Sequence, residues 1–223
     1  MNALSAGVQL AWTRARTPSL PLLLAASAAL AVALVHFTES SLDAVLEGPV
    51  LGWTLPIVGY LIAQRVTDNQ RLDHSLEPLA RHGADRRRVA VGLLLVSAAL
   101  SALTGGLLAI VTVSAAHEHF DAAWLRDLAA TTLVASAAGL VYATWFWGAS
   151  TIGRRGGGRL WALAGDLVLG AGSSLFALPF PRSHLRNLLG GLPPAGLSQR
   201  AAWLAFAILS ALTTLNTLRR LPR

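Results

Sequence analysis

The 223-residue chain is 54% hydrophobic and only 13% charged, which is unlike a soluble domain of this length. Its formal charge of +7 comes from arginine alone, because the sequence has no lysine, and the lack of cysteine excludes disulfides, thiol chemistry and cysteine-based metal sites. The arginines flank apolar runs, where they fix membrane topology, so the basic charge does not indicate nucleic-acid binding.

These properties predict an all-α polytopic membrane protein with a single transmembrane domain over 1–223. Residues 3–16 place Leu4, Val8 and Trp12 on one helical face, which predicts a helix lying in the membrane interface. Crossing a bilayer core of ~30 Å takes about 20 apolar residues of helix. Six spans of this kind are predicted, at about 20–37, 45–63, 89–113, 128–152, 160–178 and 201–218. Pro49 and Pro56 predict a kink in the second span.

The segments between the spans differ in charge. The polar loop 65–88 and the glycine-rich turn 154–159 carry arginines, whereas 179–199 is a proline- and glycine-rich segment on the opposite side. Fourteen of the 18 arginines fall on the side that holds both termini, which predicts cytoplasmic termini in a bacterial inner membrane. Tryptophans settle at membrane interfaces, and the predicted inner ones are Trp145, Trp147 and Trp161, the outer ones Trp53, Trp124 and Trp203.

Small residues recur at helical spacing in the fourth predicted span, at Thr131, Ala135, Gly139 and Ala143. Such a stripe lets another helix approach closely, since helix association in lipid depends on packing. The sequence leaves open whether that helix belongs to the same chain or to a second subunit.

The loop between the second and third spans contains a predicted short helix over 76–82. Ser75 is a good N-cap, Pro78 is tolerated in a first turn, and Gly83 is placed to end the helix. This helix would present Glu77, Arg81 and His82 to the cytosol. Two interpretations stand: the charges anchor the topology, or they form a surface on which a partner docks.

The run DHSLEPL (73–79), followed by three arginines and then VAVGLLL, resembles the cytoplasmic coupling segment of type-2 ATP-binding-cassette (ABC) permeases. Ser75, Leu76 and Glu77 match the small residue, leucine and glutamate of that segment, and Arg86–Arg88 match its arginine-rich start of the third span. His74 departs from the pattern, which often has glycine there. The six spans, the interfacial helix and a re-entrant outer segment over 179–199 are also similar to that family.

The resemblance implies the permease subunit of an exporter, working as a homo- or heterodimer with a separate ABC ATPase. It assigns ATPase coupling to Ser75, Leu76, Glu77, Leu79, Arg81 and His82, with Asp85, Arg86, Arg87 and Arg88 flanking them. A chain without lysine cannot build a phosphate-binding loop, so ATP and Mg²⁺ would be bound by the partner, and this chain would hold no cofactor. The compact length and DHSLEPL are also similar to the haem-exporter-type permeases of cytochrome maturation.

Asp166 is the one carboxylate well inside a predicted span, and an acid there is a candidate for the substrate path. The alternatives are a carboxylate facing a wet vestibule or one paired with Arg159. His117, Glu118 and His119 with Asp121 could ligate a metal, but no fourth strong ligand lies at a suitable spacing, and we predict a polar cluster without metal.

The chain itself is not predicted to be an enzyme. The segment 170–174 does not meet the G-x-S-x-G pattern of a nucleophile elbow, and H-E-x-x-H is absent. The main alternative to a permease is a structural or regulatory membrane subunit that passes no substrate. The short basic helix discriminates between them, because a subunit that receives no force from an ATPase does not need it.

Overall fold

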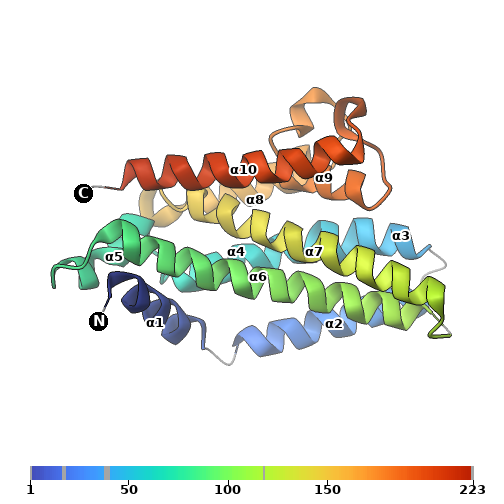
Figure 1. The fold of residues 1–223 in the computed structure, drawn as a ribbon, viewed down its shortest axis with the longest axis horizontal. Helices are drawn as coiled ribbons and strands as arrows, with labels where there is room; N and C mark the ends of the chain where they lie inside the picture. The colour runs from blue at the N-terminus through green and yellow to red at the C-terminus, as the bar shows by residue number, and fades with distance from the viewer. Residues whose placement is uncertain (1, 17–18, 38–40, 118, 222–223) are drawn as a thin grey trace.

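The chain folds into a bundle of long helices that run roughly side by side (Figure 1). The computed structural model describes residues 2–16, 19–37, 41–117 and 119–221, and within these ranges every regular element is helical. Among the residues described, four stretches are long and apolar enough to cross a membrane: Leu42–Val66, Arg86–Ala116, Ala122–Ala149 and Gln199–Arg220. The all-α prediction is confirmed, and the four apolar helices indicate a multi-pass membrane protein.

Six spans are not confirmed, because two of the predicted spans form shorter helices. Helix α2, Ser19–Phe37, covers the first predicted span, 20–37, but its apolar part Pro21–Phe37 is shorter than the helices long enough to cross a membrane. The predicted fifth span, 160–178, is wrong as one continuous helix. Helix α8, Gly158–Leu169, has 12 residues and so measures about 18 Å, well short of a bilayer core of ~30 Å.

The early end of α8 has a local cause in the arginines of α9, Pro181–Leu188. Arg182 donates a hydrogen bond from Nη1 to the Leu167 carbonyl oxygen at 2.7 Å, and Arg186 donates to the Ala171 carbonyl oxygen. The last carbonyls of a helix need such donors, and a cation suits the negative end of the helix dipole. The chain then turns through the glycine- and serine-rich run 170–174, followed by the short 3₁₀ helix η3, Leu175–Ala177.

The second predicted span contains a π-helix where a kink was expected. Helix α3, Leu42–Val45, continues into the π-helix η1, Leu46–Thr54, and then into α4, Leu55–Val66. Pro49 lies inside η1 and lacks an N–H donor, and the Thr54 hydroxyl donates to the Pro49 carbonyl oxygen at 2.9 Å. Widening to a π-helix keeps the segment helical past the proline.

The centre of the bundle is the pair α6, Arg86–Ala116, and α7, Ala122–Ala149. A Cβ added to Gly139 would lie 2.2 Å from the Ser101 carbonyl oxygen, and one added to Gly105 would lie 2.3 Å from that of Ala135. The two backbones are therefore in contact, as small residues permit. This answers the question of the small-residue stripe: at Ala135 and Gly139 it packs within the chain.

The remaining elements lie at the two ends of the bundle. Helix α1, Ala3–Ala15, packs on α6, and a Cβ on Gly7 would lie 2.3 Å from the Val89 carbonyl oxygen. At the opposite end, α9 and the 3₁₀ helix η4, Pro194–Gly196, lie against α10, Gln199–Arg220. Among the tryptophans, Trp147 is only 2% exposed and packs in a cluster with Leu72 and Leu76, so its ring contacts the bundle and not the lipid.

Candidate functional site

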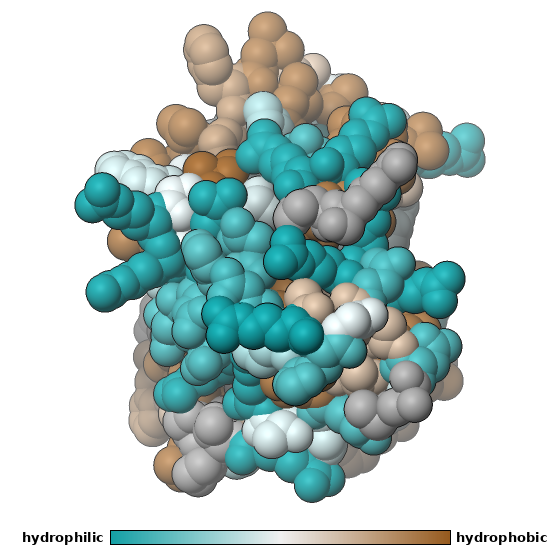
Figure 2. Space-filling view, turned by 90° about the vertical axis from the view of Figure 1, so that its left-hand side faces the viewer, coloured by the Kyte–Doolittle hydropathy of each residue, from teal (hydrophilic) through white to brown (hydrophobic). Residues whose placement is uncertain are grey.

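One end of the bundle gathers the basic segments of the sequence, and we call it the basic end. It holds α1, the short helix α5, the start of α6, the turn 150–158 and the last turn of α10, all on the left in Figure 1. Figure 2 views this end directly and shows a mainly hydrophilic surface. Arg223, counted among the basic residues of the sequence, lies outside the described residues.

Helix α5 runs over Leu72–Ala80 and starts four residues before the predicted position. The predicted N-cap at Ser75 is wrong, because this residue lies inside the helix and its hydroxyl donates to the Leu72 carbonyl oxygen at 2.7 Å. Arg71 occupies the N-cap position, and Pro78 lies near the end of the helix and not in its first turn. Gly83, as predicted, follows the helix end, with φ of +80°.

The buried face of α5 explains why the helix begins earlier. Leu72 and Leu76 are fully buried and pack in one cluster with Val89 and Leu93 of α6, while Leu79 is half-buried beside them. The spacing of Leu72, Leu76 and Leu79 is that of one helical face, and burying it outweighs the capping preference of Ser75. Ser75 and Leu76 therefore position the helix and do not reach its surface.

Hydrogen bonds tie α5 directly to α7 and α1 and, through Arg14 of α1, to α4. The Leu72 N–H donates to the Ser150 carbonyl oxygen at the end of α7, at 3.0 Å. Arg14 of α1 donates from Nη1 to the Val66 carbonyl oxygen of α4 at 3.0 Å and from Nη2 to the Ser75 carbonyl oxygen at 3.3 Å. One guanidinium thus joins α1, α4 and α5, and a fork of rigid donors fixes their mutual position.

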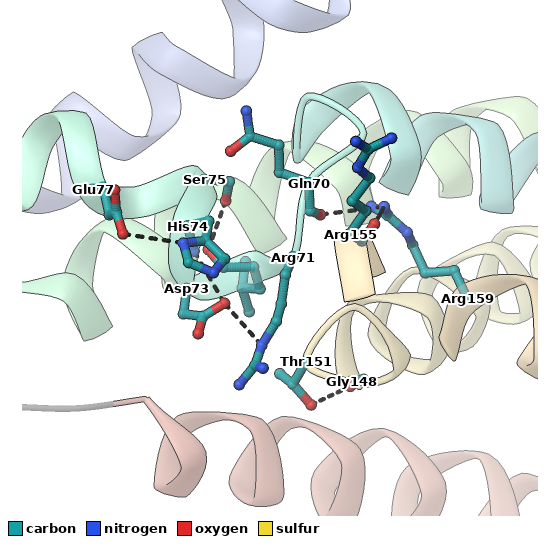
Figure 3. Close-up of polar contacts among 11 residues, drawn as sticks. Gln70, Arg71, Asp73, His74, Ser75, Glu77, Gly148, Thr151, Arg155 and Arg159 are labelled. Carbon is teal, nitrogen blue, oxygen red and sulfur yellow. Dashed lines mark hydrogen bonds and ion pairs between the residues drawn. The ribbon is translucent and has the colours of Figure 1, made fainter. Parts of the chain in front are cut away.

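The outward face of α5 carries a row of paired charges (Figure 3). Arg71 Nε lies 3.0 Å from Asp73 Oδ1, and His74 Nδ1 lies 3.0 Å from Glu77 Oε1. Arg81 reaches the other oxygen of Glu77 at 3.3 Å. Exposed pairs of this kind contribute about 0–1 kcal/mol, so they order the side chains more than they stabilise the fold. His82 is exposed beside them.

The flanking residues 85–88 form the start of α6. Asp85 caps the helix, because its Oδ1 accepts from the N–H groups of Arg87 at 2.8 Å and Arg88 at 3.2 Å. Arg88 is exposed, whereas Arg86 and Arg87 are half-buried. Asp85, predicted only as a flanking coupling residue, therefore has a structural function, and Arg88 is the most exposed arginine of this run.

A second segment lies beside α5 and was not predicted to share its surface. The turn 150–158 contains the 3₁₀ helix η2, Arg154–Gly156, with positive φ at Gly153, Arg155 and Gly156. Together with the start of α5 it encloses an open hollow of about 730 Å³, lined by Asn69, Gln70, Arg71, His74, Gly153, Arg154 and Arg155. The glycines and arginines of RRGGGR indicated an exposed basic turn at this position. Nothing in the local sequence indicated that this turn lies beside α5.

Arg159 holds this turn against the bundle. It is 3% exposed and donates to the Gln70 carbonyl oxygen at 3.2 Å (Figure 3). It also donates to the Gly156 carbonyl oxygen at 3.2 Å and to Thr67 Oγ1. The predicted pairing of Arg159 with Asp166 is therefore wrong. Arg159 satisfies carbonyls between α4 and α5, which a planar guanidinium with five donors does well.

Asp166 of α8 lies fully buried, so the predicted wet vestibule is wrong in this conformation. Its Oδ2 accepts from the Tyr142 hydroxyl at 2.9 Å, and its Oδ1 accepts from the backbone N–H of Arg182 at 3.0 Å. Nearby, Arg186 of α9 pairs with Glu47 of η1. These contacts fasten α9 to α8 and η1, and α8 to α7, and a substrate cannot reach Asp166 without their rearrangement. Its place in a substrate path stays a prediction.

The predicted polar cluster at the opposite end divides among structural contacts. Nδ1 of His117 lies 3.0 Å from the Val113 carbonyl oxygen, and its Nε2 lies 3.3 Å from Asp127 Oδ2. Asp121 caps α7, and the N–H of Trp124 is the main reason that its pKa lies below its usual range. Glu118 lies outside the described residues, and the described ones contain no group of three acidic, histidine or cysteine residues able to hold a metal.

No protein-family model matches the chain, and no curated protein matches it.

The Asp166 contacts predict a measurable stability difference. Tyr142→Phe removes the hydroxyl donor and leaves a buried oxygen of Asp166 without that hydrogen bond. The free energy of unfolding should fall by about 1–3 kcal/mol. Tyr60→Phe is the matched control, because the Tyr60 hydroxyl makes no hydrogen bond among those described. We expect a lower unfolding temperature in detergent for Tyr142→Phe alone. Equal unfolding temperatures for the two variants would contradict the structural function of this pair.

Proposed function

We propose that the protein is the permease subunit of an ABC-type exporter and that α5 is the element on which a separate ATPase docks. One observation supports this above the others: a short helix between two spans is firmly fixed by its leucine face while its charged face is free. A helix that only anchors topology needs neither the cluster around Leu76 nor the three-way bonding of Arg14.

The contacts of α5 suit the transmission of force. A push on Glu77, Arg81 or His82 would pass through the buried leucines to α6 and through Arg14 to α1 and α4. Packed elements move as rigid bodies, since close-packed interiors do not deform continuously. Closure of the partner's nucleotide-binding subunits would then tilt the start of α6 and with it the α6–α7 pair. A second permease copy, identical or related, would complete the substrate path.

The energy source must be another polypeptide under this proposal, because a chain without lysine cannot form a phosphate-binding loop. The ATP and Mg²⁺ sites would lie in that partner. The structural-subunit alternative shares the bundle but gives no reason for an outward charged row on a rigidly fixed helix.

The docking proposal predicts the outcome of a co-purification. With a tag on this chain and mild detergent, the unchanged protein should retain an ATPase that has its own lysine-containing phosphate-binding loop. The double variant Glu77→Ala with Arg81→Ala should lose it or reduce its amount about tenfold, because two exposed partners on the docking face are removed.

A matched control removes one charge of each sign at the opposite end, with Arg126→Ala and Asp127→Ala. This control should keep the ATPase at the level of the unchanged protein. If an intact, folded preparation contains no ATPase, the docking proposal fails and the structural-subunit alternative replaces it.

Orientation gives a second prediction, which the lack of cysteine makes simple to test. Arg81→Cys and Arg126→Cys place single thiols at exposed positions of the basic and opposite ends. In intact cells from which the outer membrane barrier has been removed, a membrane-impermeant maleimide should label Cys at 126 and not at 81. In inverted membrane vesicles the pattern should reverse, and the same labelling at both positions would contradict a cytoplasmic basic end.

A further inference from the structure

An apolar groove lies on the side of the bundle, between α7, α8 and α10. It has a volume of about 340 Å³ and is lined mainly by Trp145 and Gly148 of α7, Trp161 and Ala162 of α8, and Thr213 and Asn216 of α10. Trp161 is 79% exposed and Asn216 is also exposed, so the groove opens outward. Its volume falls at the lower end of those of small-molecule sites.

The groove exists because α10 packs loosely where it passes α8. Only 17% of the most apolar window of α10 is buried in the bundle, against 50% or more for each of the other three candidate spans. Gly148 brings α7 close to α10, since a Cβ there would lie 3.3 Å from Thr217 Oγ1. The short α8 leaves the space beside this contact open.

The groove ends at the basic end, beside the turn 150–158. Ile152 and Gly158 are among its lining residues, and Arg154 and Arg155, which lie between them in sequence, are exposed and line the hollow beside α5. On α10, Arg219 and Arg220 follow Asn216 by three and four residues and so share its face. Within the described residues these four arginines form no ion pair, and neither the groove nor the adjoining hollow is lined by an acidic residue.

An apolar groove with exposed arginines close to its lining residues in sequence, and no acidic residue in its lining, suits one acyl chain and the anionic headgroup of a phospholipid. From Trp145 to Ala149 the groove follows α7 for about 6 Å, and it continues to Ile152 in the turn, which is enough for part of one acyl chain. Arginine binds phosphate through a planar set of donors, and basic residues just outside a span attract anionic headgroups. Trp161 lines the groove and is exposed, which is typical of tryptophans at the interface of a membrane with water.

We infer that this groove binds a single anionic phospholipid from the leaflet at the basic end, with an acyl chain between α8 and α10 and its phosphate at Arg154 and Arg155. This inference does not depend on the proposed docking of an ATPase at α5. It gives the turn 150–158 a ligand of its own and would hold α10 against α8 through the bound chain.

The test measures lipid retention by native mass spectrometry of the delipidated full-length protein in detergent. Dioleoyl phosphatidylglycerol should bind at one molecule per chain and about tenfold more tightly than dioleoyl phosphatidylcholine, since the arginines favour the anionic headgroup. Arg154→Gln with Arg155→Gln should abolish that preference. Ala162→Phe, which fills the groove, should weaken the binding of both lipids.

The matched control is Arg126→Gln with Arg200→Gln, which removes two exposed arginines from the opposite end and should leave the preference intact. Equal retention of the two lipids by the unchanged protein would overturn the inference, as would an unaltered preference in the Arg154/Arg155 variant. Binding of glycerol 3-phosphate with the same affinity as the lipid would also overturn it, because the chain would then contribute nothing. If the variant lost an ATPase and kept the lipid, these arginines would belong to a protein interface.

Discussion

The arrangement of the basic end depends on one guanidinium group. Arg14 leaves the last turn of α1 and binds carbonyl oxygens at the end of α4 and within α5, so three segments that are distant in sequence share one set of donors. Desolvating a cation is costly unless its donors find acceptors, and the half-buried Arg14 directs two of its donors to these carbonyl oxygens. With Leu72 and Leu76 packed on α6, this contact turns α5 from a loop helix into part of the bundle. The proposal that α5 transmits force from an ATPase to the bundle depends on this rigid attachment.

A similar principle acts at the opposite end, where arginines replace the continuation of a helix. Arg182 and Arg186 supply donors to the carbonyls around the end of α8, and Asp166 accepts from the backbone of Arg182. The apolar segment after Leu160 therefore turns back before it can cross the bilayer. The same short α8 leaves α10 partly uncovered, and the lateral groove is a consequence of it. The two ends of the bundle thus owe their shapes to arginine–carbonyl contacts that link distant segments.

Much of the fold was predictable because it depends on local pattern. The lengths of the apolar runs predicted the four long helices. The spacing of the leucines in 72–79 indicates the observed start of α5 at Leu72, whereas the capping preference of Ser75 indicated a later start. The prediction of a continuous fifth span was wrong because hydropathy contains no information on the hydrogen bond from Arg182 that caps the end of α8. The prediction of a partner for Asp166 was wrong for the same reason, because it depends on contacts between distant segments. Arg159 is near Asp166 in sequence, but Tyr142 and the backbone of α9 are near it in space. Which residues face outward on α5 was partly predictable; that Arg154 and Arg155 adjoin it was not.

The attachment of α5 to the bundle is the claim on which the rest depends, and hydrogen–deuterium exchange of the full chain in detergent tests it most directly. Arg14→Ala should raise the exchange of the α5 amides about tenfold or more, since it removes two hydrogen bonds from a charged donor, while the centre of α6 and α7 stays protected. Arg16→Ala, an exposed neighbour that stacks on Trp12, should leave α5 unchanged. If α5 exchanged at the same rate in the unchanged protein and in Arg14→Ala, the helix would not be held as described, and a force applied to it would not reach the bundle by this route.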